Sequence, residues 1–228
     1  MRVAIIGIYA GRPAPLPGDG RASAIFKRPL AGRVRVTSAG LEGDAQADRR
    51  VHGGPDKALH HFPADHYRRL AAAVPELASE FVPGAIGENL SSYGLTETEA
   101  CIGDVYQLGS ARVQLSQPRT PCWKIDKKFH AEGLAQAIAV AGIAGWYYRV
   151  LQAGEIEVGD TLRLIERNAQ PFTLARMWAL GHELRPDPEE LDALAATPGL
   201  AAPWVERLRN RAAWLRRETT TSARPDPS

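Results

Sequence analysis

Cysteine is scarce in this chain, because only Cys101 and Cys122 occur among its 228 residues. Two thiols exclude a disulfide framework, and they exclude any zinc or iron–sulfur site that takes four cysteines from one chain. A single disulfide between the two stays open at this point. Since the chain starts without the pattern of a secretion signal, we expect reduced thiols in a cytoplasmic protein.

Long hydrophobic runs and net charge are also lacking. No apolar run approaches the roughly 20 residues that a membrane-spanning helix needs, so we expect no membrane partner. The formal net charge is only +2, which gives no strong attraction to nucleic acid, and we do not expect nucleic acid as a partner. Hydrophobic residues make up 44% and charged residues 24% of the chain, as in ordinary globular proteins.

What the chain does contain, over its first two thirds, is a series of short apolar or alternating runs typical of β-strands. We expect strands at residues 3–9, 24–29, 32–37, 58–62, 84–91, 105–108, 111–116, 146–150 and 161–165. Helical spacing predicts helices at 63–81, broken near Pro75, and at 129–141, with a single turn at 96–100. Residues 40–48 are too polar and glycine-rich for a regular element, so we expect a loop there.

The composition changes after residue 166, where strand patterns stop and helical patterns begin. Helices are predicted at 172–180, at 188–196 with Asp187 as N-cap, and at 203–217. The sequence therefore predicts an α+β protein with a mainly β domain at 1–167, a small three-helix domain at 168–218 and a disordered tail at 219–228.

The stretch from Ser116 to Asp126 carries the most chemistry. It follows a predicted strand and places a proline on either side of Arg119-Thr120, which predicts a stiff turn before Cys122. Arg119 and Lys124 lie close in sequence, and nearby cations favour the thiolate that binds metals and attacks electrophiles. A buried cysteine that only fills the core is the alternative, and the residues alone leave both open.

A second stretch runs from His52 to Lys57. Adjacent Gly53 and Gly54 let backbone N–H groups converge on an anion, and Lys57 could supply the countercharge. A plain turn before a short strand is the alternative. His52, His60, His61 and His66 crowd this region, but we do not expect zinc, since His60 and His61 would point to opposite faces of a strand.

Two further side chains are candidate ligand contacts. Asn89 can donate and accept hydrogen bonds, which suits a heterocyclic edge or a turn. Arg149 sits among aromatic residues, where it would meet either a ligand or an ion-pair partner. Asp56 or a nearby histidine could deliver protons. A cysteine hydrolase with His130 as its base is a weaker hypothesis.

Taken in order, several short motifs of the chain resemble the MOSC-domain family, and most closely its YiiM-type branch, which appends three helices. The motifs lie at 40–44 (Gly-Leu-Glu-Gly-Asp), 52–58 (His-Gly-Gly-Pro-Asp-Lys-Ala), 87–90 (Gly-Glu-Asn-Leu), 103–104 (Gly-Asp), 116–122 (Ser-Gln-Pro-Arg-Thr-Pro-Cys) and 145–146 (Gly-Trp).

The resemblance implies a barrel-like β domain that binds the molybdenum cofactor, with Cys122 as the catalytic residue and the protein's ligand to molybdenum. It also implies reduction of N-hydroxylated compounds, including hydroxylaminopurine base analogues, with electrons from a separate reductase. A homodimer stays open. A carrier of the cofactor or of sulfur, without turnover of its own, is the alternative function.

Because the cofactor is an anionic phosphate joined to a pterin, we expect cations, backbone donors and amides around it. Gly53 and Gly54 with Lys57 would take the phosphate, and Arg119 with Arg149 would neutralise it. Asn89, Ser116 and Gln117 would contact the pterin edges. The full expected cofactor set is His52, Gly53, Gly54, Asp56, Lys57, Asn89, Ser116, Gln117, Arg119, Lys124 and Arg149.

Overall fold

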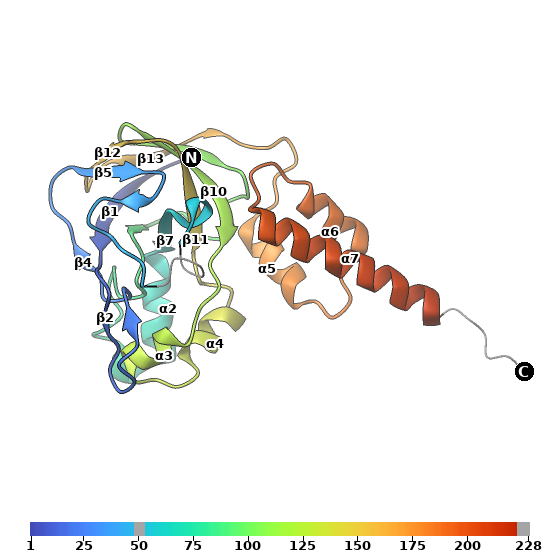
Figure 1. Ribbon diagram of the computed structural model, residues 1–228, viewed down its shortest axis with the longest axis horizontal. Helices are drawn as coiled ribbons and strands as arrows, with labels where there is room; N and C mark the ends of the chain where they lie inside the picture. Colours follow the sequence, from blue (N-terminus) through green and yellow to red (C-terminus); the bar gives the residue numbers. More distant parts are fainter. Residues whose placement is uncertain (48–52, 223–228) are drawn as a thin grey trace, which may run out of the picture.

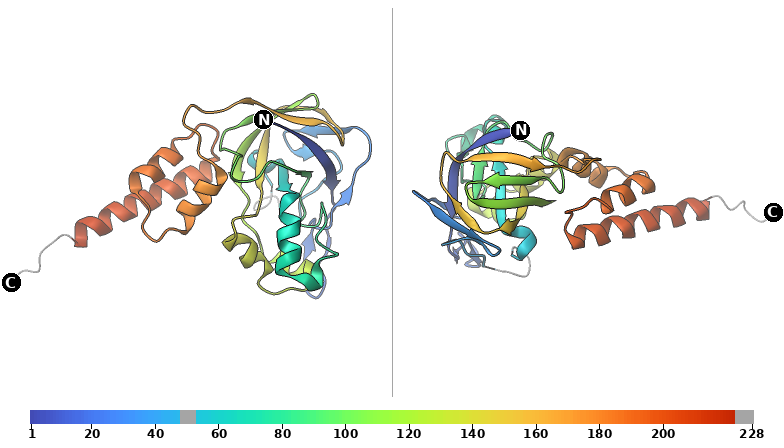
Figure 2. Two further views of the ribbon diagram at one scale, coloured as in Figure 1. Left: turned by 180° about the vertical axis from the view of Figure 1, so that it is seen from behind. Right: turned by 90° about the horizontal axis from the view of Figure 1, so that it is seen from above.

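The structure is a computed structural model, which describes residues 1–47 and 53–222 (Figure 1). A β-rich body carries the N-terminus, and three helices extend from one side of it in every view (Figures 1 and 2). The main strands are β1 (Arg2–Ala10), β5 (Val34–Thr37), β7 (Leu59–Pro63), β8 (Leu90–Ser92), β9 (Val105–Leu108), β10 (Ala111–Pro118), β11 (Trp146–Gln152), β12 (Gly154–Ile156) and β13 (Thr161–Glu166).

The main sheet closes into a barrel. Its strands follow the order β13-β9-β10-β11-β7-β8-β1, and β1 pairs back onto β13, while the short β4 (Arg28–Pro29) adds to β1. All pairings are antiparallel except β7 with β8. Alternate side chains point inward, and the largest of them, Trp146, Tyr148 and Tyr106, are fully buried. The predicted α+β fold with a barrel-like β domain is confirmed.

Strand β10 continues further than the sequence predicts. Pro118 still pairs with Trp146 of β11, and the register shifts between Leu115 and Gln117. A proline lacks the N–H that a ladder needs, so it is tolerated where a bulge or a strand end relaxes the pairing. The longer strand delivers Arg119 directly at the end of the barrel.

Three expected elements differ from the structure. The strand expected at 24–29 is limited to β4, preceded by β3 (Ala22–Ser23), and residues 24–27 between them form no regular element. The loop at 40–48 contains the short β6 (Gly40–Leu41). The stretch at 84–91 consists mostly of turns and becomes a strand only at β8.

The expected helices of the barrel domain are shorter than predicted. The stretch at 63–81 forms α2 (Asp65–Ala73) and the 3-10 turn η2 (Pro75–Leu77). The helix expected at 129–141 is limited to α4 (Leu134–Val140), and it is preceded by a helix that was not predicted, α3 (Lys124–Phe129). They are separated by left-handed residues at His130 and Gly133, where no helix can continue. The Asp126 carboxylate accepts from the Ala135 N–H at 2.7 Å and so caps the second helix.

The three C-terminal helices are α5 (Leu174–His182), α6 (Pro188–Ala195) and α7 (Ala202–Ser222). Asp187 caps α6 as predicted, since its side chain accepts from the Glu189 N–H. Their packing buries leucines, among them Leu191 and Leu208. Helix α7 enters the segment predicted as a disordered tail and ends at Ser222, and residues 223–228 lie outside the described part. No described helix is long and apolar enough to cross a membrane.

Candidate functional site

A cavity opens beside Cys122 and holds about 680 Å³ of empty space, part of it continuous with solvent. Of the residues expected to bind the cofactor, Lys57, Asn89, Arg119 and Lys124 line it together with Cys122. These residues come from segments far apart in the chain, which the barrel gathers at one end. Both cysteines are free, and Cys122 is partly exposed whereas Cys101 is buried in the core.

Arg119 is the most unusual of these side chains. It is only 6% exposed, and its Nη2 donates to the Ile86 carbonyl at 3.2 Å. Its Nη1 is buried and has no hydrogen-bond partner among the residues that the structure describes. The Tyr147 side chain on the same lining also hydrogen-bonds this guanidinium. Because a buried cation with an unused donor and no ion-pair partner among the described residues is costly, Arg119 indicates a place for an anionic ligand.

Lys27 is a second buried cation of the cavity, and the sequence did not single it out. Its Nζ lies 2.8 Å from Asp44 Oδ2, and both side chains are largely buried. Burial lowers the pKa of Lys27, and the Asp44 carboxylate opposes this effect. The only sequence signal was indirect, since Asp44 ends the Gly-Leu-Glu-Gly-Asp motif while Lys27 belongs to no motif.

Asp44→Ala is expected to lower the free energy of unfolding by roughly 3–5 kcal/mol, because it leaves the Lys27 ammonium buried without a counterion. Removing the cation as well, in an Asp44→Ala/Lys27→Met variant, is expected to restore part of that loss. Urea unfolding of the two variants and the parent protein measures both effects. A double variant less stable than Asp44→Ala would contradict the assigned pairing.

Asn89 lines the cavity, but its amide is largely committed to the protein. Its Nδ2 donates to the Tyr9 carbonyl at 3.1 Å and to Asp44 Oδ2 at 2.9 Å. Its Oδ1 accepts from the His60 N–H at 3.0 Å. Asn89 therefore joins strands β7 and β1 to the loop of Asp44, and both amide hydrogens expected to contact a pterin are already in use.

The histidines divide as the strand geometry predicts. His60 lines the cavity, whereas His61 points into the barrel, where its ring nitrogens lie 3.1 Å from Tyr148 Oη and 3.0 Å from Ser92 Oγ. Burial lowers the pKa of His61 to about 3, and it holds the pKa of His60 well below the usual value, with the Arg119 charge adding to the effect. Both rings are therefore neutral at pH 7, and His60 is a poor acid there.

Two further histidines of this region are His52 and His66. His52 lies outside the described residues. His66 is buried beside Glu97. Across residues 1–47 and 53–222, no three His, Cys, Asp or Glu side chains cluster in a way that could hold a metal ion.

Besides Asp56, five of the expected cofactor residues that the structure describes do not line the cavity. They are Gly53, Gly54, Ser116, Gln117 and Arg149. Arg149 donates from Nε to Asp56 Oδ1 at 2.7 Å, so the ion-pair alternative describes it, and Asp56, also outside the cavity, is engaged as well. Ser116 Oγ donates to the Asp56 carbonyl at 2.6 Å. These contacts hold the 3-10 turn η1 (Pro55–Lys57) against β10 and β11, and so they position Lys57.

Lys128 contacts the main chain of two segments that line the cavity. Its Nζ donates to the Ala85 carbonyl at 2.6 Å, next to the cavity residue Ile86, and lies 3.4 Å from the Ile25 carbonyl. Burial lowers its pKa to about 8, although the Glu88 carboxylate opposes this. The unfolded chain has the ordinary lysine pKa of about 10.4, so it binds more protons than the folded chain between these two values.

The stability contributed at Lys128 is therefore expected to rise with pH between about 8 and 10.4. We compare the unfolding free energy of the protein with that of Lys128→Met at pH 7 and pH 10. The difference is expected to shift in favour of the parent protein by on the order of 2 kcal/mol, because the buried ammonium loses its charge. A difference that does not change with pH would show that Lys128 titrates normally.

Comparison with known proteins identifies the family of this chain. The family model described as MOSC domain matches residues 48–163, and the model described as YiiM-like, 3-alpha helix domain matches residues 172–213. Protein YiiM of Escherichia coli is 37% identical over 206 residues, which cover 90% of this chain and 91% of that protein. The chain therefore belongs to the MOSC-domain family, in its YiiM-like branch with the three-helix domain.

Two further relatives bear on fold and activity. The crystal structure of YiiM from Geobacillus stearothermophilus superposes with a TM-score of 0.78 at 33% identity, covering 92% of this chain and 99% of that one. A protein of Gibberella moniliformis named Reductase is 38% identical over 146 residues, which are 64% of this chain but only 26% of that protein. MOSC domains are associated with molybdenum cofactor binding in general.

Proposed function

We propose that this protein is a molybdenum-cofactor-dependent reductase of N-hydroxylated compounds, with Cys122 as the protein's ligand to molybdenum. One observation carries the proposal: the cavity beside the free thiol of Cys122 contains the buried guanidinium of Arg119, whose Nη1 has no acceptor in the described part of the chain. The family membership and the reductase-named relative support the same class of reaction.

The residues present fit the cofactor. Molybdopterin brings a phosphate, a pterin and a dithiolene, so it needs cations and one soft ligand for the metal. Arg119 has an unused donor, and Lys57 and Lys124 add positive charge on the same lining. We assign the phosphate to Arg119 and these lysines. We assign Gly53, Gly54, Ser116 and Arg149 to holding the surrounding loops.

The cofactor, when bound, supplies the two-electron chemistry that cleaves an N–O bond. The balanced reaction is R–NHOH + 2 e⁻ + 2 H⁺ → R–NH₂ + H₂O, with electrons from a separate reductase protein. Cys122 anchors the metal, and Arg119 balances anionic charge in a largely buried place. His60 remains neutral and donates from Nε2 to the Ala144 carbonyl at 3.3 Å. It therefore gives the cavity a polar, uncharged side chain in a fixed orientation.

The test is to purify the protein from cells that make the cofactor and from cells that cannot. Molybdenum per chain is measured by mass spectrometry, and reduction of a hydroxylaminopurine is followed with a chemical electron donor. The proposal expects close to one molybdenum per chain and turnover only in the first preparation. Loading without turnover would favour the cofactor carrier, and an absence of molybdenum from the first preparation would overturn both.

A further inference from the structure

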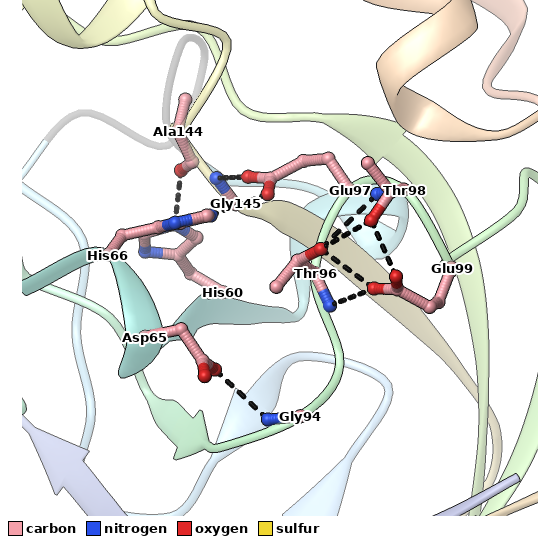
Figure 3. Close-up of polar contacts among 10 residues, drawn as sticks. All are labelled: His60, Asp65, His66, Gly94, Thr96, Glu97, Thr98, Glu99, Ala144 and Gly145. Carbon is pink, nitrogen blue, oxygen red and sulfur yellow. Dashed lines mark hydrogen bonds and ion pairs between the residues drawn. The ribbon is translucent and has the colours of Figure 1, made fainter. Parts of the chain in front are cut away.

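A two-residue segment outside the cavity, Ala144–Gly145, contacts two of the cavity residues. The segment lies between α4 and β11, and Figure 3 shows it between His60 and Glu97. The Ala144 carbonyl accepts from His60 Nε2 at 3.3 Å. The Gly145 carbonyl accepts from the Arg119 N–H at 3.0 Å. The position of this segment therefore sets the His60 ring and the main chain at Arg119.

A buried carboxylate holds the same segment from the other side. Glu97 is 7% exposed, and its Oε1 accepts from the Gly145 N–H at 2.8 Å (Figure 3). Its Oε2 lies 2.6 Å from His66 Nε2, on helix α2. Because both carboxylate oxygens have partners on different elements, the side chain has one favourable orientation.

The backbone at Gly145 has a fixed conformation, so it cannot turn its N–H to another acceptor. Its φ is +72°, a left-handed conformation that favours glycine. A Cβ atom at this position would lie 2.1 Å from the His61 carbonyl oxygen, so no larger residue fits. The Gly145 N–H is thus fixed in direction, and Glu97 supplies its acceptor.

Glu97 also contacts the three-helix domain. Its backbone carbonyl accepts from the Ala175 N–H at 2.8 Å, in the first turn of α5. The side chain of one residue therefore reaches the peptide behind the cavity while its main chain is bonded to the adjoining domain. The open groove between α2, the Thr96 turn and α5, whose lining includes His66 and Trp178, runs past Glu97.

We propose that Glu97, oriented by His66, is a positioning residue of the cavity that links its geometry to the docking of the three-helix domain. Without this carboxylate, the Gly145 N–H and the His66 ring lose their partners, and the segment that holds His60 and Arg119 is free to move. The positioning of His60 and Arg119 by Glu97 does not depend on the cofactor, whereas its effect on cofactor retention rests on the proposed function.

The test uses the full chain with Glu97→Ala and Glu97→Gln. Glutamine keeps an acceptor for Gly145 and can bond the other tautomer of His66, so it is expected to behave like the parent protein. In Glu97→Ala, we expect the Arg119 amide to exchange with solvent at least about tenfold faster, and the NMR signal of the His60 Nε2 proton to be lost. Molybdenum content is expected to fall about tenfold, as for other supporting contacts of metal sites.

Asp104→Ala is the matched control. Asp104 is fully buried and lies outside the cavity lining. Its carboxylate accepts from the Cys101 N–H and Tyr106 Oη and forms an ion pair with Arg167. It is expected to lose comparable stability while the Arg119 amide and the molybdenum content stay unchanged. If Glu97→Ala fails to fold, Glu97→Asp, whose shorter carboxylate cannot bridge both partners, replaces it.

Unchanged Arg119 exchange and an unchanged His60 signal in the Glu97 variant would overturn the inference. So would an equal loss of both in Asp104→Ala. These two measurements need no cofactor. A parent protein without molybdenum would therefore refute the proposed function while leaving the positioning role to be decided by exchange and NMR.

Discussion

Cys122→Ala is expected to fold normally and to lose reductase turnover by at least about 100-fold, with molybdenum content reduced at least about tenfold. The side chain is partly exposed just before α3, so its removal leaves no large core cavity. It is also the one soft sulfur ligand on the cavity lining, since the other cysteine lies in the core. Molybdenum analysis and a hydroxylamine reduction assay measure the two effects, and circular dichroism checks the fold.

Cys101→Ala is the control for Cys122→Ala. Cys101 is 1% exposed, and burial raises the pKa of its thiol to about 11, so it stays protonated at neutral pH. This variant is expected to lose about 1 kcal/mol of stability and to keep its molybdenum. Molybdenum that survives in Cys122→Ala, or that is lost equally in Cys101→Ala, would remove the basis for Cys122 as ligand.

Arg119→Met is expected to have opposite effects on cofactor binding and on the stability of the empty protein. Cofactor affinity should fall about 10- to 100-fold, the usual value of a charge-assisted hydrogen bond to an anion. The unfolding free energy of the cofactor-free protein should be unchanged or higher by about 1–3 kcal/mol, because a buried cation with an unpartnered Nη1 is replaced by an apolar chain. A residue kept only for folding would not show this combination.

The measurement is urea unfolding of protein made in cells without the cofactor, together with molybdenum content of protein made in cells with it. Arg167→Met serves as the matched control, because Arg167 is paired with Asp104 outside the cavity lining. It is expected to lose stability and to keep molybdenum. An Arg119→Met protein that is strongly destabilised and keeps its cofactor would contradict the assignment.

Much of the fold could be predicted because its strands and helices have a clear hydrophobic period. The alternation in β5 and β10 and the helical spacing in α5 to α7 are local signals. Helix α3 was missed because its six residues are too few for a period to show. The extension of β10 through Pro118 depends on a bulge opposite β11, which is a tertiary feature.

The candidate site was predictable where the residue type alone indicates a role, as the thiol of Cys122 and the cations of Arg119 and Lys57 do. It was not predictable where a distant partner decides the role. Arg149 and Asp56 are 93 positions apart, so the sequence could not show that they bind each other. Lys27 lies in a stretch predicted as a strand, and only the fold reveals that its side chain is buried against Asp44.

The closure of the barrel by its first and last strands has a consequence for the order of events during synthesis. Arg2 pairs with Arg163, so the ring cannot form until nearly all of the barrel domain has left the ribosome. Such long-range pairing is slow compared with local hairpins. The cavity residues lie between these two strands in sequence, and they gather only when the ring closes. Under the proposed function, cofactor insertion is therefore expected to follow closure of the barrel.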